Sequence, residues 1–288
     1  MSAGTALPAA IADYRILGSL GEGNHGTFYL AEAPERLGLS ESLVALKVFI
    51  DQAGKNAYRR GVQELRAFAA VPSPYIVRIH DAVLDGNFFY AMEHFPLGSL
   101  AAPTNRLTRK QILRALVDTC RAVQTLHDAG MVHGDIKPRN VMVHEGGSKL
   151  SDLGLVRVLD CQNEVTSMAP ATSVEYLDPG LLLSHNTPSL ASDVWSIGAT
   201  VHRALSGEGL YGELPTGQPL LAIRAVHSGG AHVSDNLRPE EADIVASCLA
   251  TPDKRLRTAA EVGDRINALI NEIGPAGRAS LPSELCQQ

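Results

Sequence analysis

Short apolar runs separated by turn residues occupy the first third of the chain, and this pattern is typical of β-strands. The runs span Tyr14 to Leu20, Thr27 to Glu32, Leu43 to Ile50, Val77 to Val83 and Phe88 to Met92. One amphipathic segment from Asn56 to Ala70 interrupts them, with apolar side chains on one helical face and prolines shortly after it. We therefore expect a β-rich region that contains one helix.

Helical periodicity dominates the chain beyond Pro96. The longest segment runs from Thr108 to Ala129, where apolar residues recur every three or four positions and Thr108 is placed to cap the helix. Further helices are expected at Ser192 to Leu205, Leu220 to His227, Glu240 to Leu249 and Ala259 to Ile273. A helical region therefore follows the β-rich one. The first dozen residues and the tail from Gly274 to Gln288 have the composition of poorly ordered segments.

Composition and charge narrow the class of protein. With 288 residues, 45% hydrophobic and 19% charged, the chain can bury a substantial core in one large domain or in two lobes around a cleft. The net charge is −6 and the basic residues are scattered, so we expect no nucleic-acid partner. The four cysteines lie far apart and no apolar run approaches the roughly 20 residues of a membrane span. We therefore expect no zinc site, no disulfides, no membrane partner and a cytoplasmic location.

Three glycines lie between the first two candidate strands, in the motif Gly21-Glu22-Gly23-Asn24-His25-Gly26. A dinucleotide-binding fold needs such a motif between a strand and a helix, and no helix follows here. A hairpin with three glycines can instead lie flat over phosphate groups, because no side chain keeps the backbone N–H groups away from the oxygens. A plain glycine-rich turn remains the alternative for this motif taken alone.

Lys47 is conspicuous because apolar residues surround it in the run Val44-Ala45-Leu46-Lys47. The ordinary alternative is a lysine at the edge of a sheet that faces solvent. Glu64 lies on the following predicted helix, where it can meet Lys47 across the β-rich region. A buried ammonium group needs such a partner, so we expect the two side chains to pair.

Two further motifs make a resemblance specific. His133-Gly134-Asp135-Ile136-Lys137-Pro138-Arg139-Asn140 resembles the catalytic loop H-R-D-x-K-x-x-N of protein kinases, and Asp152-Leu153-Gly154 resembles their D-F-G motif. Other kinase motifs are matched by Ser173 to Gly180, Ser192 to Gly198 and Thr251 to Arg255. The similarity extends from about Tyr14 to Ile270, nearly the whole chain. The chain thus resembles the eukaryotic-like, Hanks-type serine/threonine protein kinases, and its compact core and alanine-rich composition resemble the bacterial members.

The resemblance implies an α+β fold of the bilobal, protein-kinase-like type. Its small N-lobe would be an antiparallel sheet with one main helix, and its larger C-lobe would be mainly helical. The implied boundaries are an N-terminal extension at 1–13, an N-lobe at 14–92, a hinge at 93–97, a C-lobe at 98–272 and a tail at 273–288.

The resemblance also implies roles in phosphoryl transfer, with ATP and Mg²⁺ as cofactors and proteins carrying Ser or Thr as substrates. Lys47, oriented by Glu64, would hold the α- and β-phosphates, and Lys137 would touch the γ-phosphate. Asp135 would orient the acceptor hydroxyl and take its proton late in the transfer. The residues implied in metal binding are Asn140 and Asp152. The residues implied in nucleotide binding are Gly21, Gly23, Gly26, Phe28, Ala45, Lys47, Glu93, Phe95 and Met142.

Other positions refine this resemblance. A lysine two residues after the catalytic aspartate, here Lys137, is the serine/threonine pattern of the family. Ser173 stands where such kinases usually carry threonine, which also disfavours tyrosine as the acceptor. Asp193, on a predicted helix, is expected to brace the backbone of the catalytic loop. Trp195 is expected to belong to the core.

Five positions depart from the kinase pattern. They are Phe28 for a valine that caps the adenine, His25 for an aromatic, Gly134 for an arginine, Leu153 for a phenylalanine and Gly180 for a glutamate that pairs with an arginine matching Arg255. None of these changes touches the phosphate or magnesium residues, which favours an active enzyme with altered regulation. Two alternatives stay open: a pseudokinase that acts as a scaffold, and a kinase of small molecules such as antibiotics or choline.

Gly134 also bears on regulation. In relatives, an arginine at this position clamps a phosphate on the activation segment in a charge-assisted contact. With glycine there and Arg157 the nearby cation in sequence, we expect phosphorylation of Thr166, Ser167 and Thr172 not to be an obligatory switch. Activity would then be set elsewhere, by a regulatory partner or by closure of the segment.

Overall fold

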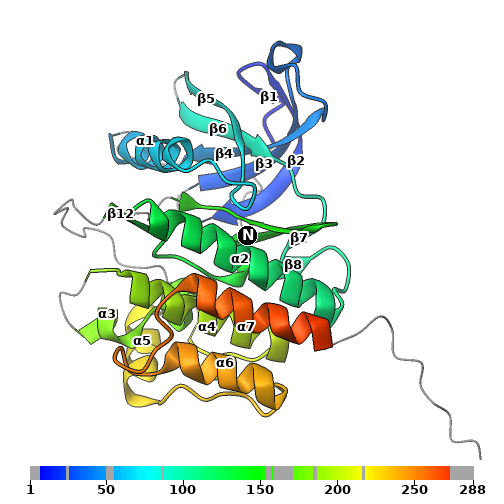
Figure 1. The fold of residues 1–288 in the computed structure, drawn as a ribbon. Coiled ribbons are helices and arrows are strands. Elements are labelled where there is room, and N and C mark those ends of the chain that lie inside the picture. The colour runs from blue at the N-terminus through cyan, green and yellow to red at the C-terminus, as the bar shows by residue number, and fades with distance from the viewer. Residues whose placement is uncertain are drawn as a thin grey trace, which may run out of the picture.

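A computed structural model of the chain describes residues 7–23, 26–49, 55–85, 87–153, 157–158, 171–183, 187–215 and 218–272. The elements form two lobes, a smaller one built mainly of strands and a larger one built mainly of helices (Figure 1). The expected α+β, bilobal fold is confirmed. Residues 1–6, the tail at 273–288, His25, Gly154, Thr166 and Ser167 lie outside the described residues, as do the side chains of Arg157, Thr172 and Ser173.

The smaller lobe contains an antiparallel sheet. Within the described residues, six strands form it in the order β1-β2-β3-β4-β6-β5, and every neighbouring pair is antiparallel. The bounds are Ala10–Ile11 (β1), Tyr14–Gly23 (β2), Gly26–Glu32 (β3), Leu43–Phe49 (β4), Ile79–Asp85 (β5) and Asn87–Glu93 (β6). The main helix predicted in this lobe is α1, Lys55–Ala70.

The alternation of side chains along β4 explains the position of Lys47. Val44 and Leu46 belong to one hydrophobic cluster, and Ala45 and Phe49 belong to another. Because successive side chains of a strand point to opposite faces, Lys47 shares the face of Ala45 and Phe49. Helix α1 packs on that same face, so the period of two along this strand directs Lys47 toward the helix.

The start of the sheet differs from the prediction in two places. Strand β1 lies within the segment expected to be poorly ordered, and it joins the sheet by pairing Ile11 with Tyr14. Strand β2 continues past Leu20 to Gly23, so the first two glycines of the motif belong to the strand. Gly23 lies opposite Gly26 of β3, which makes the motif the end of a hairpin.

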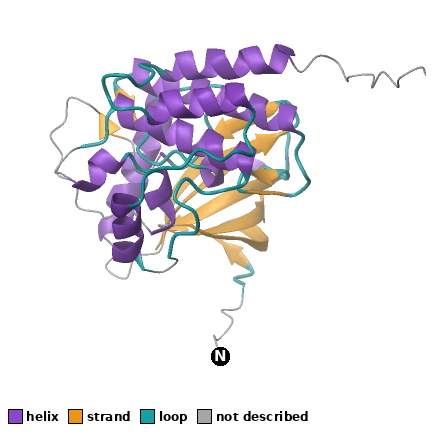
Figure 2. Ribbon diagram, turned by 90° about the horizontal axis from the view of Figure 1, so that it is seen from below, coloured by secondary structure: helices purple, strands orange, loops and turns teal. Residues whose placement is uncertain are grey.

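The larger lobe is built around α2, Arg109–Asp128, and α4, Leu190–Ser206. The other helices are α3 (Pro179–Leu183), α5 (Pro219–Ser228), α6 (Pro239–Leu249) and α7 (Ala259–Glu272), and short 3₁₀ helices span Glu35–Leu37, Pro138–Asn140 and Ala171–Tyr176. The apolar faces of α2, α4, α6 and α7 meet in one core. Seen from below, these helices stand in front of the strands of the smaller lobe (Figure 2).

The start of α2 shows how local sequence sets a helix boundary. As predicted, Thr108 caps this helix: its hydroxyl accepts from the backbone N–H of Gln111, and the Gln111 side chain accepts from the backbone N–H of Thr108.

Among the helices that the structure describes, none combines the length and apolarity needed to cross a membrane.

Short strands lie where the two lobes meet (Figure 1). In the described part of the chain, β7 (Gly98–Ser99), β8 (Ala102–Pro103), β10 (Val141–His144) and β11 (Gly147–Leu150) form a second sheet, and β9 (Met131–Val132) pairs with β12 (Arg157–Val158). The backbone of Leu150 joins the lobes, because its carbonyl accepts from Val77 at 3.0 Å and its N–H donates to Tyr75 at 2.8 Å. The two kinase-like motifs flank β10 and β11, so the fold places both at this junction.

Candidate active site

Lys47 forms an ion-paired cluster with two carboxylates from distant parts of the chain. Its Nζ lies 3.0 Å from both carboxylate oxygens of Glu64 on α1 and 2.8 Å from Oδ1 of Asp152, which follows β11. The side chains of Lys47 and Glu64 are 2% and 1% exposed, whereas that of Asp152 is 18% exposed. The predicted meeting of Lys47 with Glu64 is confirmed, and Asp152 is the more accessible of the two partners.

The charges in this cluster depend on one another. Burial works against the charge of Lys47, but Asp152 and Glu64 outweigh it and raise the pKa of the ammonium group. Burial also disfavours the carboxylate of Asp152, yet Lys47 lowers its pKa. At Glu64 burial dominates and raises the pKa of the carboxyl to about 7, although Lys47 and Tyr90 favour the ionised form. A fixed positive charge therefore lies beside an ionised carboxylate that solvent can reach.

Asp152 adopts a backbone conformation that is uncommon for a residue with a side chain. Its φ is +61°, in the left-handed region. Such strain persists only where the surroundings hold the residue, and here the ion pair with Lys47 fixes the carboxylate. The next residue, Leu153, is fully buried in the core of the larger lobe. The departure from phenylalanine at Leu153 thus keeps an apolar anchor beside Asp152.

The catalytic-loop motif brings three of its polar residues together. Nζ of Lys137 donates to both carboxylate oxygens of Asp135, at 2.9 and 2.7 Å. The side-chain amide of Asn140 donates to the carbonyl of Asp135 at 2.8 Å and to its Oδ2 at 3.2 Å. Exposure is 5% for Asp135 and 4% for each of the other two. The loop is therefore a preorganised group of one carboxylate, one ammonium and one amide.

Asp193 on α4 braces this loop, as predicted. Its Oδ2 accepts from the backbone N–H of His133 at 2.8 Å, and its Oδ1 accepts from that of Gly134 at 2.9 Å. Nε2 of His127 lies 2.9 Å from the same Oδ2. Gly134 has φ of +75°, a conformation in which glycine avoids the steric cost of a Cβ. The departure at Gly134 therefore has a conformational reason that the motif alone does not reveal.

Four of the residues implied in nucleotide binding gather in one hydrophobic cluster. They are Phe28, Ala45, Phe95 and Met142. Ala45 comes from the sheet of the smaller lobe and Met142 from β10 at the junction, so elements on both sides of the lobe boundary contribute. Glu93 is placed differently, because its carboxylate binds Nζ of Lys149 at 2.8 and 2.6 Å. A ligand would therefore meet the backbone of Glu93 rather than its carboxylate.

The glycines of the hairpin meet different structural needs. Gly21 has φ of +121°, a backbone conformation that residues with side chains rarely adopt. A Cβ at Gly26 would lie 2.3 Å from the backbone oxygen of Val48 in β4, so the close approach of the two strands excludes a side chain. The sequence motif marks both positions but does not distinguish these two reasons.

The hairpin lies over the Lys47 cluster. A Cβ at Gly23 would lie 2.6 Å from the ring of Phe28, and that ring has its centroid 5.7 Å from Nζ of Lys47. On its other side, the hairpin reaches the catalytic loop, because Nη1 of Arg139 donates to the carbonyl of Glu22 at 3.2 Å. The predicted glycine, lysine and catalytic-loop motifs therefore converge on one place.

Comparison with known protein families identifies the family of this chain. The family model described as "Protein kinase domain" matches residues 14–264. This chain belongs to the protein kinase family. The resemblance to Hanks-type serine/threonine kinases is thereby confirmed, and the curated relatives carry such names.

Three of these relatives show the range of similarity. The serine/threonine-protein kinase ppk16 of Schizosaccharomyces pombe is 29% identical over 68% of this chain and 29% of its own length. The kinase PknA of Mycobacterium tuberculosis is 28% identical over 72% of this chain and 50% of its own. The kinase PkaB of Streptomyces coelicolor is 26% identical over 91% of this chain and 64% of its own. The chain thus spans half or less of the first two relatives.

Two contacts of this kinase do not follow from its motifs. The hydroxyl of Tyr90 donates to Oε1 of Glu64 at 2.7 Å inside the smaller lobe. The sequence signal at Tyr90 is only an aromatic residue in a β-run. The departure at Gly180 removes a glutamate, but Arg255 does not lose its carboxylate partner, because Asp178 lies 2.6 Å from Nη1 of Arg255. An aspartate two residues before Gly180 is the one signal that could have indicated this replacement.

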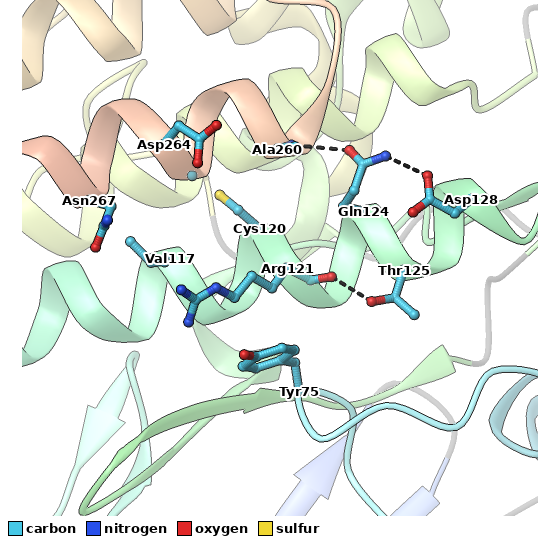
Figure 3. Close-up of a pocket in the computed structure, with 11 residues that line it drawn as sticks. Tyr75, Val117, Cys120, Arg121, Gln124, Thr125, Asp128, Ala260, Asp264 and Asn267 are labelled. Carbon is cyan, nitrogen blue, oxygen red and sulfur yellow. Dashed lines mark hydrogen bonds between the residues drawn. The ribbon is translucent and has the colours of Figure 1, made fainter.

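The described residues of this kinase also line a cavity of about 350 Å³ that is separate from the site. It lies between α2 and α7, with Cys120 and Arg121 on the side of α2 (Figure 3). The guanidinium of Arg121 lies 5.3 Å from the centroid of the Tyr75 ring. None of the predicted site residues lines this cavity. The motif residues therefore lie apart from this cavity.

Proposed function

We propose that this kinase transfers the γ-phosphate of ATP, with Mg²⁺, to Ser or Thr hydroxyl groups of proteins. The observation that supports this most is the assembly of Lys47, Glu64 and Asp152 from separate elements into one charged cluster. This cluster adjoins the catalytic loop, because the backbone N–H of Ser151, next to Asp152, donates to the carbonyl of Asn140 at 2.8 Å. Phosphoryl transfer requires mainly positioned charge rather than covalent chemistry. A cluster with one permanent cation and one accessible carboxylate suits that requirement.

The nucleotide would lie between the glycine hairpin and the hydrophobic cluster. Ala45, Phe28 and Met142 would contact the adenine, and the backbone of Glu93 and Phe95 would meet its edge. Gly21, Gly23 and Gly26 would let the hairpin backbone approach the phosphates. Lys47 would hold the α- and β-phosphates, because its charge is fixed and Glu64 limits where its Nζ can lie.

Asp152 and Asn140 form a donor set that fits a magnesium ion. Asp152 offers a carboxylate with a lowered pKa, and Asn140 offers an amide oxygen, both of the hard oxygen type that Mg²⁺ prefers. Within the described residues, no group of three or more His, Cys, Asp or Glu could enclose a metal by itself. The two residues would therefore share the ion with phosphate oxygens. When bound, Mg²⁺ supplies charge neutralisation on the phosphates.

The acceptor hydroxyl would be oriented by Asp135. This carboxylate is held from both sides, by the ammonium of Lys137 and by the amide of Asn140. Asp135 would accept the hydroxyl proton late in the transfer, and Lys137 would neutralise charge on the transferred group. The hinge would be residues 93–97, between an N-lobe at 14–92 and a C-lobe at 98–272.

The test is incubation with γ-labelled ATP, Mg²⁺ and a general protein substrate, followed by mapping of the labelled sites. We expect phosphoserine or phosphothreonine in the wild-type reaction and at least about a hundredfold loss with Asp135→Asn. Asp253→Asn, in an exposed loop of the larger lobe, is the matched control and should transfer like wild type. No protein label would favour a scaffold, label on small metabolites would favour a small-molecule kinase, and a phosphotyrosine majority would contradict the acceptor class.

A further inference from the structure

Tyr90 is a buried polar residue that the proposed reaction does not use. It lies on β6 and is 1% exposed. Its hydroxyl donates to Oε1 of Glu64 at 2.7 Å, and its ring packs against Phe49 and Phe68 with centroid distances of 5.7 and 6.2 Å. Because the pKa of this hydroxyl is raised well above its ordinary value by burial, Tyr90 remains a donor at every physiological pH.

The placement of Tyr90 follows from the register of the sheet. Lys47 on β4 and Tyr90 on β6 are directly opposite each other, so their side chains leave the sheet on the same face. Both side chains then converge on Glu64 of α1: Oε1 accepts from Lys47 at 3.0 Å and from Tyr90 at 2.7 Å, and Oε2 accepts from Lys47 at 3.0 Å. The carboxylate of Glu64 is thus held by one charged and one neutral donor of the same sheet.

The two donors differ in what else they can bind. Lys47 also pairs with Asp152, and under the proposed function it would bind the nucleotide phosphates as well. Each anion that approaches Lys47 competes with Glu64 for the same ammonium group. Tyr90 is neutral and fully enclosed, so it offers nothing to an approaching phosphate and keeps its bond to Glu64.

We propose that Tyr90 is a positioning residue, which fixes the carboxylate of Glu64 on α1. Glu64 then keeps Lys47 at the position where it would bind the phosphates, while the other anions around Lys47 change. This inference rests on the proposed function. It predicts that the hydroxyl of Tyr90 contributes to the transfer step through Glu64 and Lys47, without touching the nucleotide or the protein substrate.

A second tyrosine in the same sheet provides a matched control. The hydroxyl of Tyr14 donates to Oδ2 of Asp81 at 2.6 Å, its ring packs edge-on against Phe89, and it is fully buried. Asp81, like Glu64, also has a basic partner, since Nη2 of Arg36 lies 2.6 Å from it. Tyr14→Phe and Tyr90→Phe therefore remove the same kind of hydrogen bond from the same sheet. Only Tyr90 is linked to Lys47.

The experiment compares wild type, Tyr90→Phe and Tyr14→Phe by thermal unfolding and by steady-state transfer of labelled phosphate. We expect both variants to lower Tm to a similar extent, and only Tyr90→Phe to lower kcat, by about tenfold, with the KM for the protein substrate unchanged within about twofold. Should Tyr90→Phe not fold, Tyr90→Met, which has a smaller and more flexible apolar side chain without a donor, replaces it in the comparison.

The outcomes separate this inference from the proposed function. If wild type and both folded variants transfer phosphate with the same kcat, Tyr90 is only structural and the inference is overturned while the function stands. The same holds if Tyr14→Phe loses as much kcat as Tyr90→Phe. If wild type transfers no phosphate at all, the proposed function fails and the inference fails with it.

Discussion

Nη1 of Arg255 donates to Oδ2 of Asp178 over 2.6 Å, and only 3% of the arginine side chain is exposed. The same Nη1 reaches the carbonyl of Ala191 at 2.7 Å, and the guanidinium lies 5.3 Å from the centroid of the Trp195 ring. The kinase pattern places a glutamate at Gly180 for this arginine. Here Asp178, two residues nearer the N-terminus, supplies the carboxylate. The ion pair between the start of α3 and the loop before α7 therefore forms without that glutamate.

Replacing Asp178 should therefore destabilise the larger lobe. Asp178→Ala leaves the guanidinium of Arg255 buried without its anionic partner, a change that typically costs about 3 kcal/mol or more of unfolding free energy. Urea unfolding of the variant would measure this loss. Asp253→Ala removes an exposed carboxylate from the same lobe and should stay within about 0.5 kcal/mol of wild type. Equal stabilities of the two variants would contradict the structural role of Asp178.

A second substitution can restore the pair in the position that the family pattern uses. A Cβ at Gly180 would lie 3.3 Å from Oδ1 of Asp178, and that atom is absent once Asp178 is alanine. We expect Asp178→Ala/Gly180→Glu to recover about half or more of the lost free energy, because the new carboxylate can reach Arg255. Gly180→Glu alone should stabilise nothing, since Arg255 already has its partner.

The motifs predict which side chains meet at the lobe junction, because the phosphate and metal chemistry that they indicate accepts few residue types. Under the proposed function, Lys47, Asp135, Asn140 and Asp152 would each supply one charge or one oxygen donor at one place, so few other residue types would serve there. The need of a buried ammonium group for a partner predicts the pairing of Lys47 with Glu64, which the structure confirms. The pattern of apolar and polar residues predicts the longer strands and helices. Its errors lie mainly at the ends of the elements and in the shortest elements, such as β1 and α3.

The remaining features could not be predicted because they depend on contacts between distant residues. Asp178 and Arg255 are 77 residues apart, and any acid nearby in space could have replaced the missing glutamate. Tyr90 resembles any apolar strand residue until the register with β4 is known. Gly26 is read as a phosphate-loop glycine, while the structure shows that the backbone of β4 also excludes a side chain there.

Lys47→Met and Asp152→Asn should each lower turnover by at least about a hundredfold, because each removes a charge that faces the transferring phosphate under the proposed function. Folding should survive in Lys47→Met, since the pKa of Glu64 is already raised to about 7 by burial and the carboxyl can take up a proton. The measurement is initial rate together with thermal unfolding. Lys254→Met, in an exposed loop, is the control. A folded Lys47→Met variant with near-wild-type turnover would refute the assignment of the phosphate site.

Gly26→Ala should destabilise the smaller lobe whether or not nucleotide is present. Its Cβ would lie 2.3 Å from the oxygen of Val48, so β3 and β4 would have to separate, at a cost of about 1 to 3 kcal/mol. Gly18→Ala is the matched control, because nothing lies within 4 Å of a Cβ there. Denaturant unfolding without ATP measures both variants. If Gly26→Ala unfolds like wild type, the strand-packing explanation of this glycine is wrong.

Acid should weaken the ion pair that links α2 and α6. Nε of Arg109 donates to Oε1 of Glu241 at 2.7 Å, and the backbone N–H of Arg238 donates to Oε2 at 2.9 Å. Burial opposes the charge on Glu241, but the contacts with Arg109 and with the backbone N–H of Arg238 together outweigh burial and hold the pKa below its ordinary value of 4.5. The unfolded chain then binds the extra proton first, so this stabilisation is present above pH 4.5 and is lost as pH falls through the folded pKa.

Glu241→Gln tests the predicted direction of this change in stability with pH. The variant should unfold more easily than wild type near neutral pH, and the difference should shrink as the pH is lowered from about 6 to about 3.5. Urea midpoints across this range measure it. Glu240→Gln, at the exposed neighbouring position, should show no such convergence. A difference that grows toward acid would mean that Glu241 is not ionised by its contacts in the folded state.

The last prediction concerns regulation and depends on Gly134. This residue has φ of +75° and donates its N–H to Asp193 at 2.9 Å, so it completes the catalytic loop but offers no guanidinium to a phosphate. A lone exposed arginine elsewhere would hold a phosphorylated segment with about 1 kcal/mol or less, which shifts populations only several-fold. We therefore expect the Thr166→Ala, Ser167→Ala, Thr172→Ala triple variant, and phosphatase-treated wild type, to keep turnover within about a hundredfold of untreated wild type at the first turnover on an exogenous substrate. A greater loss in both would exceed about 2.7 kcal/mol in activation free energy, more than such a contact can supply, and would show that phosphorylation of this segment is an obligatory switch.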